Sequence, residues 1–341
     1  MTRIESISLT QLTDDQWQKY CEASKEIRRV YYPELIRKHN TWQEFKKEYL
    51  ERIEFNKQNF YNEQVFFENG IVAGWVDYYV DSNACYFGFN YMFDVIPGSL
   101  ISLMLNSVYN IVCEKNLKSA NYWSFDSRRI DVMKNINAEI SEEFETYKLD
   151  RKDMSIEMYY SIIENAKLPG DFDLKLYNEL PENLTDKFIE FENNLIEEIN
   201  KLNPSELKIP LMKITDFSRQ ALYNKNIGVE TLQYILLNEQ GDIAANCSVL
   251  IDSKNKDTIR HMGGLTAVSK THRGNGFGKF LKAKLYKLLL DENKDFKYIL
   301  TDTMPWNSYM FRINNEFGFK PFKHGYTFKL SKEFLENYLN K

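Results

Sequence analysis

A glycine-rich loop in the second half of the chain carries the residue types best suited to chemistry. It reads Arg273-Gly-Asn-Gly-Phe-Gly-Lys279 and lies between a predicted strand end and a predicted helix start. Alternate glycines let the backbone adopt positive φ angles and approach a ligand closely. Successive N–H groups and the N-terminus of the following helix then point at one concave spot that suits a phosphate. Because Arg273 and Lys279 add positive charge, the loop predicts a pyrophosphate-binding site.

Two other phosphate-binding loops do not fit this spacing. A Rossmann loop needs Gly-x-Gly-x-x-Gly in a parallel-sheet context near the chain start, whereas the glycines here occur as Gly-x-Gly-x-Gly. A Walker loop needs Gly-Lys-Ser or Gly-Lys-Thr, and neither follows the loop. A glycine-rich turn alone is also typical of an ordinary strand-to-helix connection. The sequence downstream is needed to choose between that connection and a phosphate-binding loop.

A second motif downstream of the loop strengthens the interpretation. The segment Thr301-Asp-Thr-Met-Pro-Trp-Asn307 leads into Met310, Ile313-Asn314 and Phe317-Gly-Phe319. Together with the loop, this segment resembles the tandem type of GNAT acetyltransferase, of which mycothiol synthase is an example. The resemblance implies that acetyl-CoA is the co-substrate, that no metal is needed and that the acetyl group passes to a primary amine of a small molecule. Direct attack by the amine is favoured over a covalent acyl-enzyme, because no cysteine lies in either motif.

The resemblance also assigns the residues that hold acetyl-CoA. In GNAT proteins the strand before the loop parts from its neighbour and pairs with the pantetheine arm, which implies this role for Thr266, Ala267 and Val268. The Val268 N–H would stabilise the thioester carbonyl oxygen. Asn307 corresponds to the asparagine that contacts the pantetheine region, and it also suits a helix N-cap. The pyrophosphate would be bound by the loop residues Arg273, Gly274, Asn275, Gly276, Phe277, Gly278 and Lys279.

The sequence offers several candidates for the acid and the base of the reaction. Many GNAT enzymes place a tyrosine four residues before the glycine that ends the second helix, as the acid for the CoA thiol, and Asn314 stands at that position here. Asparagine can hydrogen-bond the sulfur but does not readily supply a proton, so Tyr309 or water is the alternative. His261 and Glu230 are candidates for the base, although an isolated histidine on a strand is more often structural. His272 suits a phosphate-side contact or a surface position.

A repeated pattern of strands and helices must position these residues. A strand hairpin turns at Asn69-Gly70 in the first half and at Glu239–Asp242 in the second, about half a chain apart, so an internal duplication is the simplest explanation. Strands are predicted at Gln64–Glu68, Ile71–Val80, Cys85–Val95, Ala120–Phe125, Met158–Ile162, Leu232–Asn238, Ile243–Ile251, Ile259–Val268, Tyr298–Thr303 and Tyr326–Leu330. Helices are predicted at Asp14–Arg29, Trp42–Phe60, Leu100–Cys113, Ile130–Ile136, Asn183–Asn200, Asp216–Asn224, Gly278–Leu290 and Asn307–Glu316.

The duplication predicts an α/β (α+β) protein with two tandem GNAT-like domains, each a mixed, mostly antiparallel sheet flanked by helices. Residues 1–164 would form the first domain, 165–179 a linker, and 180–341 the acetyl-CoA-binding domain. In place of the loop, the first half has Asp94, whose charge repels phosphate, and Pro97, which lacks an N–H. We expect this degenerate half to be catalytically silent and to wall the substrate site or stabilise the other half.

Composition limits the remaining choices. The chain has 341 residues, 43% hydrophobic and 27% charged, which is typical of a soluble globular protein with two domains. No apolar run is long enough to span a membrane and no secretory signal is recognisable, so we expect a cytoplasmic monomer or homodimer with no membrane partner. A net charge of -5 disfavours nucleic acid. The four cysteines lack a Cys-x-x-Cys pair and suggest reduced, structural thiols.

Two other classes of function compete with this prediction. An aminoacyl transferase that uses charged tRNA would also have paired GNAT folds, but the intact pyrophosphate loop and the negative net charge argue against it. A non-catalytic acyl-CoA-binding sensor or scaffold would keep the loop while lacking an acid and a base. Acetyl-CoA binding tests the first alternative, and turnover of amines tests the second.

Overall fold

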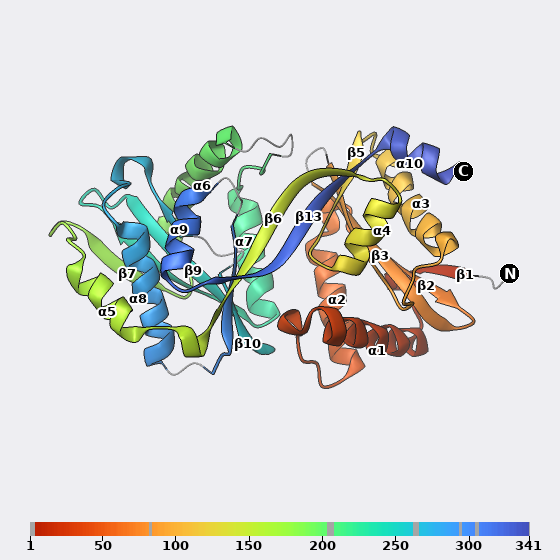
Figure 1. Cartoon of the computed structure of the whole chain (residues 1–341), viewed down its shortest axis with the longest axis horizontal. Coiled ribbons are helices and arrows are strands. Elements are labelled where there is room, and N and C mark those ends of the chain that lie inside the picture. Colours follow the sequence, from red (N-terminus) through yellow and green to blue (C-terminus); the bar gives the residue numbers. More distant parts are fainter. Residues whose placement is uncertain are drawn as a thin grey trace. The chain divides into compact units, whose positions relative to one another are not determined.

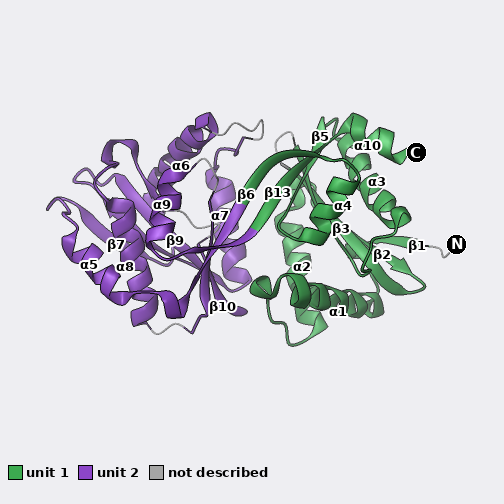
Figure 2. Cartoon of the chain, in the orientation of Figure 1, with its two compact units in different colours: residues 1–144, 324–341 green, residues 145–323 purple. Residues whose placement is uncertain are grey.

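The computed structural model describes residues 4–81, 84–202, 208–261, 266–292, 295–303 and 307–340. The chain forms two compact units (Figure 2). Unit 1 comprises the residues up to Phe144 together with those from His324 onward, and unit 2 comprises Glu145–Lys323. Each unit is a mixed sheet with helices on both faces (Figure 1), which confirms the predicted α/β class.

The sheet of unit 1 contains the first predicted hairpin. Its strand order is β1 (Ile4–Ser8), β2 (Asn62–Glu68), β3 (Ile71–Asp81), β4 (Ala84–Tyr91), β5 (Ser119–Ser124) and the final part of β13 (Lys320–Ser331). Strands β4 and β5 pair in parallel, whereas β1 to β4 pair in antiparallel fashion. The hairpin is confirmed: Asn69 and Gly70 have φ angles of 53° and 76°, the left-handed pair that a two-residue turn requires.

Helices cover both faces of this sheet. On one face, α1 (Asp14–Tyr31) and α2 (Trp42–Phe55) enclose an aromatic core in which the rings of Trp17, Tyr20 and Phe45 lie 5.7 to 6.5 Å apart. On the other face lie α3 (Gly98–Glu114), α4 (Ser127–Asn135) and α10 (Lys332–Leu339). The predicted start of α1 at Asp14 is confirmed, and a capping box between Thr13 and Gln16 begins the helix there.

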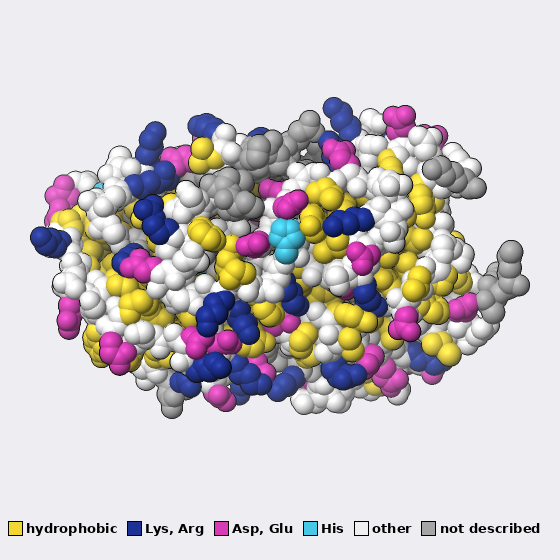
Figure 3. All heavy atoms as spheres, viewed as in Figure 1, with side chains coloured by type: hydrophobic (Ala, Val, Ile, Leu, Met, Phe, Trp, Pro, Cys, Tyr) yellow, Lys and Arg dark blue, Asp and Glu magenta, His cyan; other side chains and the backbone are white. Residues whose placement is uncertain are grey.

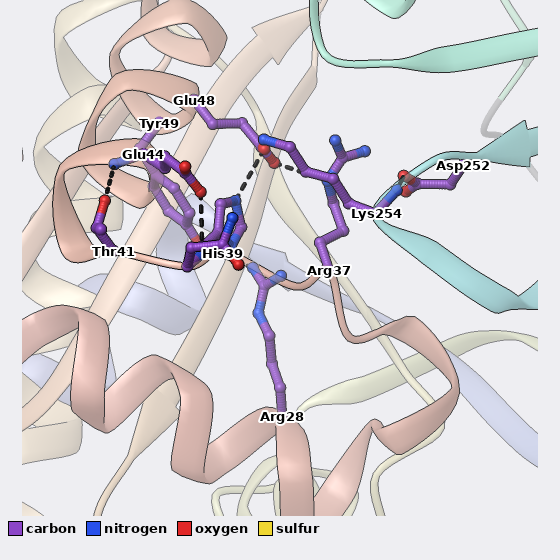
Figure 4. Close-up of polar contacts among 10 residues, drawn as sticks. Arg28, Arg37, His39, Thr41, Glu44, Glu48, Tyr49, Asp252 and Lys254 are labelled. Atoms are coloured by element: carbon purple, nitrogen blue, oxygen red, sulfur yellow. Dashed lines mark hydrogen bonds and ion pairs between the residues drawn. The ribbon is translucent and has the colours of Figure 1, made fainter.

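Polar contacts hold the connection between α1 and α2 inside unit 1 (Figure 4). The Glu48 carboxylate of α2 receives Arg37 Nε at 2.8 Å and His39 Nε2 at 2.8 Å. The Arg28 guanidinium of α1 donates to the Tyr49 hydroxyl of α2 at 2.6 Å. These contacts fasten α2 to α1 and to the segment between them.

The sheet of unit 2 contains the second predicted hairpin, formed by β8 and β9. Its strand order is β7 (Asp173–Tyr177), β8 (Val229–Leu237), β9 (Ile243–Asp252), β10 (Asn255–Arg260), β12 (Tyr298–Thr303) and the final part of β6 (Glu139–Asp150). Strands β10 and β12 pair in parallel. A short strand, β11 (Thr266–Val268), pairs with β9 in antiparallel fashion.

Two groups of helices enclose the sheet of unit 2. One face packs against α5 (Ile156–Asn165), α8 (Phe277–Asp291) and α9 (Ser308–Glu316). The other face packs against α6 (Glu182–Leu202) and α7 (Ile214–Asn226). A ligand held between the strands of this sheet can therefore be reached from α8 on one side and from α6 on the other.

Several segments differ from the prediction. Met158–Ile162 is not a strand but part of α5, because the Ser155 hydroxyl caps a helix whose apolar side packs on α8. The predicted strand Ile259–Val268 is divided into β10 and β11, and its residues 262–265 lie outside the described residues. The predicted strand Cys85–Val95 ends at Tyr91. Part of the predicted linker forms β7, which pairs with β8.

Each unit also contains strand residues from the other half of the sequence. In unit 1, Tyr326–Ser331 of β13 pairs with β5. In unit 2, Glu145–Asp150 of β6 pairs with β12. The compact units therefore divide the chain at other positions than residues 164 and 180, because long strands that leave one unit complete the sheet of the other.

The surface and the cysteines bear on the choice of partners. None of the helices in the described parts of the chain is both long and apolar enough to cross a membrane. On the face shown in Figure 3, Lys and Arg side chains are interspersed with Asp and Glu. All four cysteines are free thiols, and Cys21, Cys85 and Cys247 are buried, as expected for cysteines that fill a core.

Candidate functional site

The glycine-rich loop leads directly into α8. Gly274 and Gly276 have φ angles of 85° and 78°, a left-handed conformation that side chains disfavour. A Cβ atom at either position would meet nothing within 4 Å, so glycine is required for the backbone conformation and not for space. Gly276 is also the N-cap of α8 and offers no side-chain hydrogen bond to its first turn. The N–H groups of this helix end are thus suited to an anion.

Gly278 brings α8 close to β11. A Cβ atom at this position would lie 3.4 Å from Val268 Cγ2 and 3.5 Å from Thr266 Cγ2. These are ordinary van der Waals distances, so α8 packs directly on β11 at this point. The first turn of α8 therefore lies against the same strand that was predicted to pair with pantetheine.

Strands β10 and β12 part in front of this helix end. They pair as far as Arg260, and the His261 N–H then donates to the Leu300 carbonyl at 2.7 Å. After the described residues resume, β11 continues to pair with β9, as β10 does, but within the described residues it has no pairing with β12. The Ser269 N–H donates to a β9 carbonyl at 2.8 Å, and because bonded and non-bonded residues alternate in an antiparallel ladder, the Val268 N–H points away from β9.

A cleft of about 540 Å³ lies at this opening in unit 2. Its walls combine the loop, both strand ends, the start of α9 and the C-terminal half of α6. Predicted residues that line it are His261, Thr266, Ala267, Val268, Arg273, Gly274, Gly276, Phe277, Gly278, Asn307 and Tyr309. His272, for which a phosphate-side contact or a surface position was expected, also lines it. Residues on the wall with no predicted role are Leu195, Glu198, Ile199, Leu202, Thr301, Asp302, Ser308, Met310 and Ile313. Predicted residues outside the lining are Asn275, Lys279 and Asn314.

The two cations of the loop are paired with carboxylates. Arg273 Nη2 forms an ion pair with Glu198 of α6, and its Nε donates to the Val268 carbonyl at 3.1 Å. Lys279 forms an ion pair with Glu316 of α9. A phosphate at the end of α8 would compete with the Glu198 carboxylate for Arg273, because both anions suit the same guanidinium.

Asn307 caps α9, as one of its two predicted roles requires. Its side-chain oxygen accepts from the Met310 N–H at 3.1 Å. The residue also lines the cleft, so its predicted contact with pantetheine is compatible with its place. The cap fixes the direction in which α9 leaves the cleft.

His261 lies on the cleft floor with both ring nitrogens engaged. Its Nε2 is 2.8 Å from Thr266 Oγ1, and its Nδ1 is 3.1 Å from the Tyr286 hydroxyl. Burial, with a smaller effect from the positive charge of Lys282, holds the pKa of His261 well below its usual range. The ring is therefore neutral at physiological pH, and the candidate base Glu230 lies exposed on β8 outside the cleft lining.

The alternative acid Tyr309 stands at the mouth of the cleft. Its side chain is half-exposed, and the Arg312 guanidinium lies 5.7 Å from its ring centre. Tyr309 is thus available to solvent and is not part of the core.

Asn314 is fully buried and touches a lysine that sequence reasoning missed. Its Nδ2 donates to Thr303 Oγ1 at 2.8 Å, and its Oδ1 accepts from Lys282 Nζ at 2.5 Å. Lys282 of α8 is fully buried beneath aromatic rings, among them that of Phe319 at 4.8 Å. Burial lowers the pKa of Lys282 to about 8. The sequence did contain a signal for this burial. Lys282 lies four residues from both Gly278 and Tyr286, which places its charge on the apolar side of α8.

The corresponding place in unit 1 is filled by arginine. Strands β4 and β5 pair in parallel as far as Phe87, and beyond them Arg129 Nη1 donates to the Phe89 carbonyl at 2.9 Å. Arg129 Nε also lies 3.2 Å from the Asp126 carboxylate. The strand carbonyl that could meet a pantetheine arm in unit 1 is therefore already bonded to the protein.

Comparisons with solved structures place this arrangement among known folds. A tandem GNAT protein from the clavulanic acid biosynthesis pathway superposes with a TM-score of 0.75 and 13% identity, over 97% of this chain and 99% of that one. A GCN5-related N-acetyltransferase from Sphaerobacter thermophilus matches at 0.63 and 6% over 96% of both chains. A GNAT acetyltransferase from Colwellia psychrerythraea matches at 0.55 and 11% over 96% of this chain and 99% of that one.

Sequence comparison adds nothing to these structural matches. No protein-family model matches the chain, and no curated protein matches its sequence. At identities this low the likeness concerns the fold, so the chain has the fold of tandem GNAT proteins. Its chemistry must be argued from the cleft of unit 2.

Proposed function

We propose that unit 2 binds acetyl-CoA in the cleft and transfers the acetyl group to a primary amine of a small molecule. The observation that carries the proposal is the uncapped N-terminus of α8 after the left-handed Gly276, which opens into the cleft where β10 and β12 part. A pyrophosphate suits that helix end, and the extended pantetheine arm suits the edge of β11 opposite β9, which has no strand partner among the described residues. Both parts of CoA thus find partners in one cleft.

The main steps use groups that face the cleft. The Val268 N–H stabilises the oxyanion that forms when the amine attacks the thioester carbonyl. Arg273 exchanges its carboxylate partner for the pyrophosphate. The remaining acidic groups on the wall, Glu198 and Asp302, favour a cationic acceptor over an anionic one.

Lys282 is proposed to support departure of the CoA thiolate. Asn314 occupies the position where the family resemblance places a tyrosine acid, and Lys282 donates to its oxygen. A positive charge in this buried site stabilises a nearby thiolate more strongly than it would in water. Lys282 acts here through Asn314 and is a positioning residue.

Acetyl-CoA titration calorimetry on two glycine variants tests the site. Gly276→Val strains the left-handed turn before α8, and Gly241→Val strains an equally left-handed turn of the β8–β9 hairpin, where φ is 72°. We expect Gly276→Val to weaken acetyl-CoA binding at least about tenfold and Gly241→Val to leave it unchanged. Lack of binding by the wild-type protein would sink the proposal.

Turnover measurements test the transfer itself. Polyamines, aminoglycosides and amino acids form a suitable panel, with release of the CoA thiol as the readout. We expect at least one class of primary amine to be acetylated. Acetyl-CoA binding without turnover of any amine would instead favour an acyl-CoA-responsive sensor or scaffold.

A further inference from the structure

A buried polar pair lies on the α6 side of the unit 2 sheet. Glu192 of α6 is 7% exposed, and Asn246 of β9 is fully buried. Their surroundings are apolar and include Phe188 and Ile235 of the same face. A carboxyl group and an amide in such a place need hydrogen-bond partners, because desolvating them without partners is costly.

The pair adjoins the wall of the cleft. Asn246 is directly opposite Ala267 in the β9–β11 ladder, and Ala267 lines the cleft. On α6, Glu192 shares one face of the helix with Leu195 and Ile199, three and seven residues further on, and both of these line the cleft. The two polar groups therefore lie where the α6 wall of the cleft meets β11.

Some polar atoms of Glu192 and Asn246 are not satisfied by hydrogen bonds of good geometry. Among the described residues, Glu192 Oε1 and the Oδ1 and Nδ2 atoms of Asn246 make no hydrogen bond of good geometry, although the Asn246 amide is close enough to the Glu192 carboxyl to lower its pKa. Leaving such a buried polar group unsatisfied destabilises the folded protein. The Asn246 N–H can serve one lone pair of the Glu192 carboxyl, which leaves Asn246 Oδ1 and the other Glu192 lone pairs as acceptors for a polar ligand.

The carboxyl of Glu192 can exist in both charge states near neutral pH. Burial raises its pKa to about 7, while the Asn246 amide acts in the opposite direction. On α7, which packs against α6, Asp216 and Arg219 pair with each other at 3.3 Å. On β9, Cys247 faces the opposite side of the sheet, towards α8. These neighbours do not fix the protonation state of Glu192, so a bound ligand can change it.

The chemistry of the pair selects that ligand. The acceptor atoms Glu192 Oε1 and Asn246 Oδ1 match the several N–H donors of a primary ammonium group. An anion would be repelled by the carboxylate. A neutral hydroxyl would satisfy one acceptor and leave the other unpaired.

We propose that Glu192 and Asn246 receive the ammonium group of the acceptor and that Glu192 takes its proton, an inference that rests on acetyl transfer in the cleft. One proton passes from the ammonium to the Glu192 carboxylate. The amine nitrogen then bonds to the thioester carbonyl carbon, and the carbon–sulfur bond breaks. A second amine proton ends on the CoA sulfur, and Glu192 returns the first proton to solvent.

The first test follows the Glu192 carboxyl itself and needs no turnover. Glutamate labelled with ¹³C at Cδ is titrated by NMR in the wild-type protein, and Glu192→Gln identifies the signal. We expect n-propylammonium to move the Glu192 midpoint about one pH unit downward, because a cation beside a carboxylate favours its charged form. Neutral n-propanol at equal concentration and equal ionic strength should have no effect. An unchanged midpoint with n-propylammonium would mean that water alone occupies the pair, and the inference would be overturned.

The second test separates this inference from the proposed function. Glu192→Gln preserves shape, and Glu190→Gln, an exposed position on the same helix, is the matched control. We expect Glu192→Gln to bind acetyl-CoA as wild type does, to lose turnover about 100-fold, and to lose the fall in rate below about pH 7 that a general base causes. A wild-type protein that does not bind acetyl-CoA refutes acetyl transfer. Normal turnover and an unchanged pH profile in Glu192→Gln refute the role of Glu192 alone.

Discussion

The Lys282 ammonium donates a 2.5 Å hydrogen bond to the Asn314 side-chain oxygen. Both side chains are fully buried. The pair places a positive charge next to Asn314, the residue at the position where the family resemblance puts a tyrosine. Asparagine alone gave no source of charge for the departing thiolate. In the proposed mechanism, Lys282 of α8 supplies that charge.

Replacing Lys282 with methionine keeps an unbranched side chain and removes its charge. We expect kcat to fall about 100-fold while acetyl-CoA affinity stays within about twofold, because the charge acts on a thiolate that exists only late in the reaction. Steady-state kinetics and calorimetry separate these two quantities. Lys284→Met, on the same helix, is the control, and a Lys282→Met enzyme with wild-type kcat would contradict the proposed role.

The Glu192→Gln variant should be more stable than the wild type at high pH. The pKa of Glu192 is raised from 4.5 to about 7 in the folded state, so folding is penalised above the folded pKa and unaffected below the unfolded one. We expect the variant to gain up to about 3 kcal/mol of unfolding free energy at about pH 8 and almost nothing at about pH 4. Urea unfolding at the two pH values measures this difference. An equal gain in unfolding free energy at the two pH values would contradict the raised pKa of the Glu192 carboxyl.

Glu198 should compete with acetyl-CoA for Arg273. Neutralising it in Glu198→Gln frees the guanidinium, and because a partly exposed ion pair is worth about 1 kcal/mol or less, affinity should rise about fivefold at most. Arg273→Gln should weaken binding about tenfold. Lys287→Gln, further along α8, serves as the control for loss of a cation. Calorimetry at two salt concentrations measures all three, and a weaker-binding Glu198→Gln would argue that Glu198 holds the ligand instead.

Arg129 should matter for unit 1 and leave the cleft of unit 2 unaffected. Arg129→Met removes a buried partner of Asp126 and the donor to the Phe89 carbonyl, which we expect to cost about 3 kcal/mol of stability. Scanning calorimetry measures the loss, with the exposed Arg312→Met as the control. Acetyl-CoA affinity should stay unchanged, and a large drop would indicate that unit 1 takes part in binding.

Local signals in the sequence predicted most of the fold. The Asn69-Gly70 turn, the glycines before α8 and the Asn307 cap each act within a few residues, so their consequences can be read from a short segment. Met158–Ile162 was predicted wrongly because a short apolar run suits a strand as well as a helix, and the deciding contact with α8 comes from far along the chain.

The polar groups inside unit 2 could not be predicted in the same way. Lys282 and Glu192 each lie on an amphipathic helix, where a charged residue is ordinarily assigned to the solvent side. Their burial depends on how α8 and α6 sit against the sheet, and the pairing with Asn314 and Asn246 joins segments far apart in sequence. The glycine-rich loop was enough to locate the cleft from the sequence. Lys282 and Glu192 could be recognised only in the folded structure.

Because Tyr326–Ser331 completes the sheet of unit 1, synthesis of this protein imposes an order on its folding. The ribosome releases the strands of the first half before β13, yet β5 lacks its β13 neighbour until the residues that follow unit 2 emerge. Phe328 and Leu330, both fully buried in the core of unit 1, are translated only after the whole of unit 2. A shortened chain that ends at the close of unit 2 would therefore damage the half that was translated first.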